Sequence, residues 1–265
     1  MEIEINGQRS YAYTGGRALD PSLPSVVFIH GAAHDHSVWT LQSRYFAWHG
    51  MNAVAFDLPG HGRSADPPLA SVAALADWVS ARLDALGIGR ASLVGHSMGS
   101  LVALACAAGR PERIERLALL GCTVPMNVAD VLLDAARDDP PAAIAMITQW
   151  SHAPTTLLGS SPLPGLWLPA MNRALMARAR PGVLHRDLRN CRDYADGLDA
   201  AGKVRCPTLI LAASRDLMTP PKSIEPLCAA LRQVSVVGID GAGHAMMTER
   251  ADAVLDTLRS FVHGS

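Results

Sequence analysis

Neither sign of charge dominates this sequence. Its 265 residues hold 23 Lys and Arg against 24 Asp and Glu, for a formal net charge of -1. A nucleic-acid or membrane-surface partner usually requires a basic excess, so this balance argues against both. Apolar runs are also short: none approaches the roughly 18 residues of a membrane span, and no basic and apolar leader opens the chain. We therefore expect a cytoplasmic protein whose partner is a small molecule.

Cysteine is scarce and shows no paired pattern. The five cysteines are an odd set without the spacing of a disulfide framework or a metal site, so we expect them to be reduced. Cys106 and Cys206 are expected to be small core residues. The chain is long enough to bury about 70 to 75% of its unfolded surface, and we expect one domain that needs no disulfide, metal or cofactor.

One segment combines an apolar strand, a glycine-flanked serine and an alanine-rich helix. Gly95-His96-Ser97-Met98-Gly99 has the form Gly-x-Ser-x-Gly at the junction of a predicted strand and a predicted helix. The two glycines allow neighbouring backbones to approach a tight turn, which would expose the Ser97 hydroxyl above the sheet. The free N–H groups at the start of the helix would stabilise an oxyanion there. The segment therefore predicts a nucleophile elbow.

Continuous apolar runs alternate with helical stretches along most of the chain. Strands are predicted at residues 25–30, 52–57, 91–94, 114–120, 206–213 and 234–239, and helices at 38–49, 69–86, 100–108 and 247–261. Residues 3–13 have the alternation of a hairpin. This order predicts an α/β fold with a doubly wound, mostly parallel sheet flanked by helices. Residues 122–203 lack a buried strand and predict a helical cap over the strand ends, inserted between core residues 1–121 and 204–265.

Two late loops carry the groups that a serine nucleophile needs. A serine hydroxyl is a weak nucleophile until a base removes its proton, and an acceptor must hold that base in one tautomer. Asp216 follows one predicted strand, and His244 follows the next in a glycine-rich loop. Both should emerge at the same sheet edge as Ser97. The chain order is therefore serine, acid, histidine.

This order, with Gly-His-Ser-Met-Gly at the elbow and His30-Gly31 after an early strand, strongly resembles the α/β-hydrolase superfamily over essentially the whole chain. The resemblance implies Ser97 as the nucleophile and His244 as the general base and then acid. It implies Asp216 as the residue that orients His244. The motifs are specific for the superfamily and say little about the substrate.

The resemblance also implies an oxyanion hole and leaves rival residues to consider. The backbone N–H groups of Met98 and Ala32 would form the hole, because the residue two after the His of the His-Gly motif usually donates there. His96 is expected to pack beside the nucleophile, and His61 to belong to a structural loop. Some relatives carry the acid after an earlier strand, but Gly121 and Cys122 stand there. The remaining acid candidates lie in the last helical stretch of the cap: Asp193, Asp196 and Asp199.

A dense group of histidines after the first buried strand invites a metal interpretation. The group contains His30, His34, Asp35 and His36. It has no obvious remote partner and its spacing matches no zinc motif, so we favour a polar loop in which Asp35 or Ser37 caps the following helix. His34 is expected at the pocket entrance.

Apolar cap residues are expected to roof the pocket and exclude water. The residues proposed to bind substrate are His34, Trp150, Trp167 and Met171. The leading hypothesis is a serine hydrolase that cleaves a small, largely apolar carboxylic ester, thioester or lactone through an acyl-Ser97 intermediate.

Several alternatives share these residues. Hydrolysis of a C–C bond in a diketone-like compound and perhydrolysis with hydrogen peroxide use the same three side chains. A non-catalytic ligand-binding relative and a cofactor-free oxygenase belong to other classes, and the intact serine, acid and histidine argue against them. The oligomeric state stays open, including a homo-oligomer.

Overall fold

The computed structural model describes residues 1–5, 7–65, 67–161 and 165–264. Among these residues, eight strands form one sheet in the order β1-β2-β4-β3-β5-β6-β7-β8. The strands are β1 (Glu2–Ile5), β2 (Gln8–Tyr13), β3 (Ser25–Ile29), β4 (Asn52–Phe56), β5 (Ala91–His96), β6 (Ile114–Leu120), β7 (Thr208–Ala213) and β8 (Val234–Ile239). All six predicted strands of the alternating pattern are present, and so is the hairpin.

The sheet is parallel except at one edge. β1 and β2 form the antiparallel hairpin, and β2 pairs antiparallel with β4, while all later pairs are parallel. Strand order reverses at β3, which lies between β4 and β5. Loops that follow strands on either side of such a reversal diverge and leave a crevice at the carboxyl ends. The predicted doubly wound α/β fold is confirmed.

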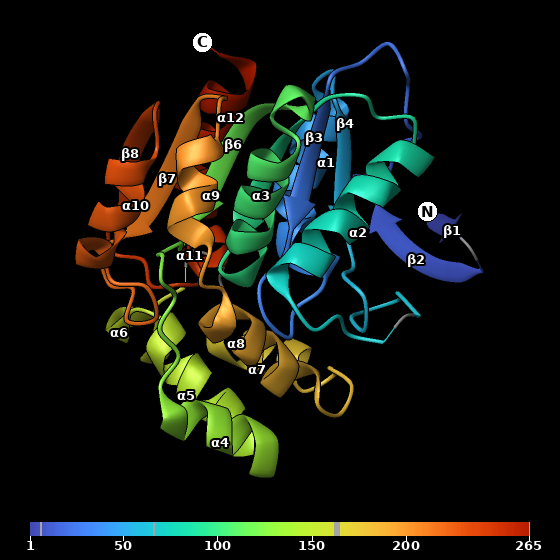
Figure 1. Cartoon of the computed structure of the whole chain (residues 1–265). Coiled ribbons are helices and arrows are strands. Elements are labelled where there is room, and N and C mark those ends of the chain that lie inside the picture. Colours follow the sequence, from blue (N-terminus) through green and yellow to red (C-terminus); the bar gives the residue numbers. More distant parts are fainter. Residues whose placement is uncertain (6, 66, 162–164, 265) are drawn as a thin grey trace.

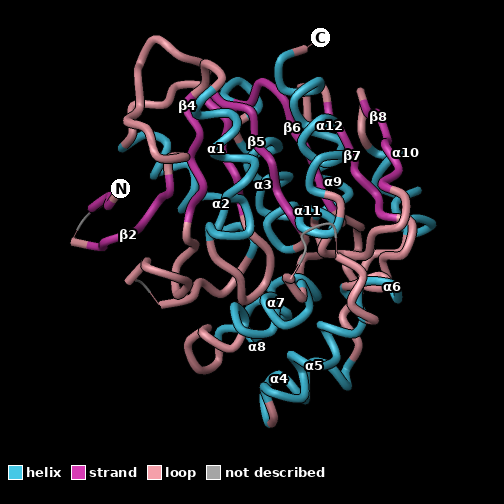
Figure 2. Tube along the Cα trace, turned by 180° about the vertical axis from the view of Figure 1, so that it is seen from behind, coloured by secondary structure: helices cyan, strands magenta, loops and turns pink. Residues whose placement is uncertain are grey.

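Helices cover both faces of the sheet and bury two hydrophobic clusters, one on each face. One layer contains α2 (Val72–Ala85), α3 (Met98–Gly109) and α10 (Glu225–Ala230) (Figure 1). The view from behind shows the other layer, with α1 (Thr40–Trp48), α11 (Met246–Glu249) and α12 (Ala251–His263) (Figure 2). Central strands covered on both faces need apolar residues at successive positions, which explains their continuous apolar runs.

A helical insert separates β6 from β7. It contains α4 (Asp130–Asp138), α5 (Pro140–Ser151), α6 (Pro154–Leu157), α7 (Leu168–Met176), α8 (Val183–Asp193) and α9 (Gly197–Lys203). Helices α4 to α8 lie below the carboxyl ends of the strands and bury a third hydrophobic cluster (Figure 1). Helix α9 instead packs beside α3 and α10 on the sheet layer. The division at residues 122–203 remains a prediction.

Two helix boundaries differ from the prediction. The helix expected from residue 69 begins at Val72, because the Ser71 side chain caps it and accepts a hydrogen bond from the N–H of Ala74 at 3.1 Å. The helix expected over residues 247–261 is divided into α11 and α12, because Arg250 leaves the helical conformation with φ -137°. Asp35 accepts a bond from the N–H of Ser37 and caps the 3₁₀ turn before α1, as predicted.

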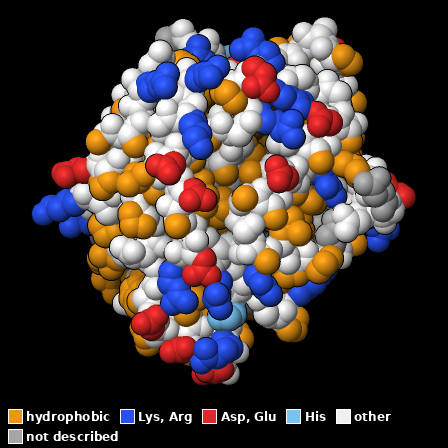
Figure 3. Space-filling model, viewed as in Figure 1, with side chains coloured by type: hydrophobic (Ala, Val, Ile, Leu, Met, Phe, Trp, Pro, Cys, Tyr) orange, Lys and Arg blue, Asp and Glu red, His pale blue; other side chains and the backbone are white. Residues whose placement is uncertain are grey.

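Charges of both signs are interspersed on the surface, in keeping with the small net charge (Figure 3). Several form ion pairs on the insert, including those of Arg137 with Asp134 and Asp138, and of Arg189 with Asp193. Exposed pairs of this kind contribute little to stability. No helix in the described part of the chain is long and apolar enough to span a membrane.

Candidate active site

The turn between β5 and α3 holds Ser97 in a strained conformation. Its φ of 52° and ψ of -122° lie outside the regions that non-glycine residues usually adopt. The turn needs glycine on both sides, because a Cβ on Gly95 would overlap the backbone of Gly99. A Cβ on Gly99 would in turn overlap the carbonyl oxygen of Ile29. The glycines therefore allow α3 to pack directly on the sheet, and the Ser97 side chain is left facing a cavity.

Asp216 and His244 lie together at the ends of β7 and β8. Nδ1 of His244 is 2.8 Å from Oδ2 of Asp216. The other carboxylate oxygen, Oδ1, accepts bonds from the N–H groups of Met218 and Thr219, both at 2.8 Å. The hydroxyl of Thr219 donates to Oδ2 at 2.7 Å. These bonds fix the carboxylate, which in turn selects the tautomer of His244 with hydrogen on Nδ1.

Electrostatics at this pair favour an ionised Asp216, and one ring nitrogen of His244 is left without a partner in the described part of the chain. Burial alone would raise the pKa of Asp216, but His244 and the hydrogen bonds from Thr219 outweigh it and hold that pKa below its ordinary value. Nε2 of His244 is buried and has no hydrogen-bond partner among the described residues. It lines the same cavity as Ser97. A buried nitrogen without a partner is ready to accept a proton from a group that enters this cavity.

Two backbone N–H groups are available beside Ser97. Met98 is the first residue of α3, so its N–H has no acceptor within the helix. Ala32 lines the cavity with Ser97, and within the described ranges no hydrogen bond occupies its N–H. Their location fits the expected oxyanion hole. The next residue, Ala33, has a positive φ of 52° and donates its own N–H to Asp187 at 2.8 Å.

Two cavities meet at His244. The first, which we call the serine cavity, has a volume of about 150 Å³ and contains Ser97 and Ala32 on its wall. Its apolar lining comes mainly from the insert: Val128, Leu132, Ile147, Trp150, Met176 and Leu188. The second cavity has a volume of about 320 Å³ and lies between α7 and the residues after His244. His34, His96, Ser151 and His244 line both cavities.

A family model described as "Alpha/beta hydrolase family" matches residues 26–257. That range spans the parallel part of the sheet from Val26 in β3 to β8, the insert and every candidate residue discussed above. This chain belongs to the alpha/beta hydrolase family.

Relatives of this hydrolase include several esterases. The pimeloyl-[acyl-carrier protein] methyl ester esterase of Neisseria meningitidis serogroup C is 29% identical, over 94% of this chain and 97% of its own. The putative carbamate hydrolase RutD of Klebsiella pneumoniae is 28% identical over 90% of this chain and 91% of its own. Among solved structures, the enol-lactonase from Burkholderia xenovorans LB400 superposes with a TM-score of 0.86 at 24% identity, over 99% of this chain and 100% of its own. That last likeness supports the fold.

Three of the four residues proposed to bind substrate line a cavity in this hydrolase. Trp150 lines the serine cavity, Met171 lines the second cavity, and His34 lines both. Trp167 was expected there too, and its role in binding stays a prediction. Its side chain is half exposed and lies outside the lining of both cavities described here. Trp167 precedes α7 as its N-cap residue.

His34 lines both cavities of the hydrolase and is held by two hydrogen bonds. Its Nδ1 lies 2.6 Å from the carbonyl oxygen of Ala32, and its Nε2 lies 2.6 Å from the side-chain amide of Asn172 on α7. Burial lowers the pKa of His34, which favours the neutral ring. His34 therefore links the loop of Ala32 to the insert.

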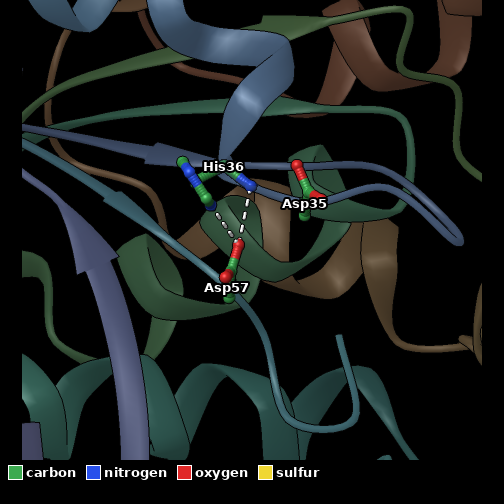
Figure 4. Close-up of side chains that lie close together, drawn as sticks. All are labelled: Asp35, His36 and Asp57. Carbon is green, nitrogen blue, oxygen red and sulfur yellow. Dashed lines mark hydrogen bonds and ion pairs between the residues drawn. The ribbon is translucent and has the colours of Figure 1, made fainter. Parts of the chain in front are cut away.

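The histidine-rich loop does not gather into one cluster. His30 is buried against His61, and His34 faces the cavities, while Asp35 and His36 lie near Asp57 (Figure 4). Asp57 accepts bonds from the N–H and Nδ1 of His36 at 2.8 and 2.7 Å. Asp57 also accepts a hydrogen bond from the N–H of Arg63, and Asp35 accepts one from the N–H of Ser37. The carboxylates of Asp35 and Asp57 and the ring of His36 are thus already engaged in hydrogen bonds. Those of Asp57 join the loop after β3 to the loop after β4.

Sequence patterns indicated His96 at the site but missed several other residues that shape it. His96 was expected beside the nucleophile, and its Nε2 lies 2.9 Å from the carbonyl oxygen of His244. Gly121 was dismissed for lacking a carboxylate, yet a Cβ there would come within 2.8 Å of Cε1 of His244. Thr219 could have been noticed, since a hydroxyl three residues after Asp216 can bond within the same turn. No local pattern pointed to Asp187, which lies 154 residues from its partner Ala33.

Proposed function

We propose that this hydrolase cleaves small, largely apolar carboxylic esters, thioesters or lactones through an acyl-Ser97 intermediate. The observation that carries the proposal is the unpartnered, buried Nε2 of His244 on the wall of the serine cavity, while its Nδ1 is held by Asp216. This is the arrangement that activates a serine hydroxyl in acyl transfer. The esterase relatives support the same reaction class.

Each group has one task in the proposed reaction. Oγ of Ser97 attacks the carbonyl carbon while Nε2 of His244 takes its proton. The carbonyl oxygen becomes an oxyanion, and the N–H groups of Ala32 and Met98 stabilise it. The C–O or C–S bond then breaks, and the leaving group takes the proton from His244. Water, activated by the same nitrogen, attacks the acyl-Ser97 ester, and the acid leaves with Ser97 restored.

The two cavities suggest where the acyl group and the leaving group of the substrate bind. We assign the acyl group to the serine cavity, because its walls are apolar and it contains Ser97. Its volume of about 150 Å³ suits a short or medium acyl chain. The leaving group would then occupy the second cavity, which also adjoins His244 and contains the polar side chains of Asn172 and Arg178.

The test is the initial rate of hydrolysis of p-nitrophenyl acetate, butyrate, hexanoate and octanoate. We expect turnover by the wild type with an optimum among the shorter chains, and loss of turnover in Ser97→Ala. An exposed serine in the chain's first loops, Ser22, supplies the matched control Ser22→Ala, which should behave like the wild type. If a folded wild type hydrolyses none of these esters, the proposal fails, and C–C bond hydrolysis of a diketone-like compound becomes the next candidate.

A further inference from the structure

The carboxylate of Asp187 reaches from the insert into the loop after β3. Asp187 lies on α8 and is almost completely buried. Its Oδ2 accepts the N–H of Ala33 at 2.8 Å and also lies 2.7 Å from Nε2 of His61. A buried carboxylate is costly unless its charge and its lone pairs are satisfied. Both partners of this oxygen belong to the core, so Asp187 forms a buried bridge between the two parts of the molecule.

His61 supplies the charge that balances Asp187. Its second ring nitrogen, Nδ1, lies 3.0 Å from the carbonyl oxygen of Pro59. A carbonyl and a carboxylate can only accept hydrogen bonds, so both ring nitrogens must carry hydrogen and the ring is an imidazolium. Burial alone would lower the pKa of His61, but the charge of Asp187 and the hydrogen bonds to Asp187 and Pro59 together outweigh it, and the pKa is raised.

The residue that Asp187 holds is conformationally strained. Ala33 has a φ of 52°, which costs free energy for a residue with a Cβ. Its side chain is buried in the hydrophobic cluster of the insert, beside Leu132 and Leu188. The preceding N–H, that of Ala32, is the proposed oxyanion donor. The backbone at Ala33 therefore sets the direction of that donor, and Asp187 is the hydrogen-bond acceptor that holds it.

We propose that Asp187 is a positioning residue for the oxyanion loop. Its carboxylate, paired with charged His61, fixes α8 of the insert against Ala33, so that the N–H of Ala32 points to the place where the oxyanion forms. Asp187 touches no reacting atom. An N–H displaced from that place stabilises the transition state less while substrate binding changes little, so the effect falls on kcat. The inference rests on the proposed function for its catalytic consequence, while the bridge itself is a property of the folded chain.

The test compares Asp187→Ala and Asp187→Asn with Asp193→Asn. Asp193 lies on the same helix but is half exposed and pairs with Arg189, so it serves as a matched control. For p-nitrophenyl butyrate we expect Asp187→Ala to lower kcat by about tenfold or more with KM within about twofold. Asp187→Asn keeps an acceptor for the N–H of Ala33 but loses the charge, so its kcat should lie between that of Asp187→Ala and that of the wild type. Asp193→Asn should match the wild type.

A second readout separates the bridge from the reaction. Amide hydrogen exchange at Ala33, followed by NMR, should be slow in the wild type and at least about tenfold faster in Asp187→Ala. The ¹⁵N shifts of the His61 ring should report an imidazolium near neutral pH. Unchanged kcat in a folded Asp187→Ala variant, or unchanged exchange at Ala33, would overturn the inference. If the wild type hydrolyses no ester, the proposed function fails, and exchange and ring charge still decide whether the bridge exists. If Asp187→Ala does not fold, Asp187→Asn carries both measurements.

Discussion

The sheet core and the helical insert contribute to the site in different ways. The core supplies Ser97, Asp216 and His244, each in a loop that directly follows a strand of the parallel sheet. The insert supplies apolar walls and a few buried polar contacts, such as Asp187 on Ala33. Loops at strand ends hold reactive groups rigidly. The helices of the insert pack on their own hydrophobic cluster, so their sequence can vary without disturbing the sheet. Changes in the core should therefore abolish the reaction, and changes in the insert should alter its rate or selectivity.

The largest effect is expected from the core acid. Asp216→Asn should lower kcat by about 10³-fold or more, because the amide no longer holds His244 with hydrogen on Nδ1. Stopped-flow or steady-state kinetics of ester hydrolysis measure kcat, and thermal unfolding shows whether the variant is folded. Asp196→Asn is the matched control, since Asp196 was a rival candidate and lies at the start of α9. Wild-type turnover in Asp216→Asn would remove Asp216 from the account.

An intermediate effect is expected from the bridge between core and insert. Asp187→Ala should reduce the free energy of unfolding by about 3 kcal/mol, because it leaves the buried His61 charge without a partner. The folded-state pKa of His61 is raised. The contribution of the pair is therefore complete below the unfolded value of about 6.5 and is lost as pH rises through the folded value.

Urea unfolding at about pH 6 and pH 9 measures this dependence. The difference between wild type and Asp187→Ala should be larger at the lower pH. The charged and titratable groups around His61 are Asp187 on α8, His30 after β3 and Asp57 after β4, and the first of these lies in direct contact. A difference that stays equal or grows at the higher pH would show that Asp187 and His61 do not form an ion pair.

The smallest effect is expected from the insert wall. Trp150→Ala enlarges the serine cavity. The kcat/KM for longer acyl chains, relative to that for acetate, should therefore rise by about tenfold, which is the effect of one or two methylene groups in an apolar pocket. Trp167→Ala is the control, because Trp167 lies outside the lining of both cavities described here. The ratio of octanoate to acetate turnover measures both variants. Equal ratios in the two variants would argue against the serine cavity as the acyl site.

The same division explains what could be predicted from the sequence. Ser97, Asp216 and His244 stand next to continuous apolar strands and glycine turns, which are local patterns, so their common edge followed from the order of strands. The side of a helix that faces the site depends on how the insert packs on the core. The contacts of Asn172 and Asp187 with residues more than a hundred positions away were therefore missed.

The central claim is that Ser97 is the nucleophile. Intact-mass measurement after treatment with a fluorophosphonate, which reacts with activated serines, tests it directly. The account predicts a single adduct on the wild type, located at Ser97 by peptide mapping, and no adduct on Ser97→Ala. It also predicts a much slower reaction in His244→Ala, because Nε2 of His244 activates the hydroxyl. A wild type that stays unlabelled, or an adduct of equal yield on Ser97→Ala, would contradict the account.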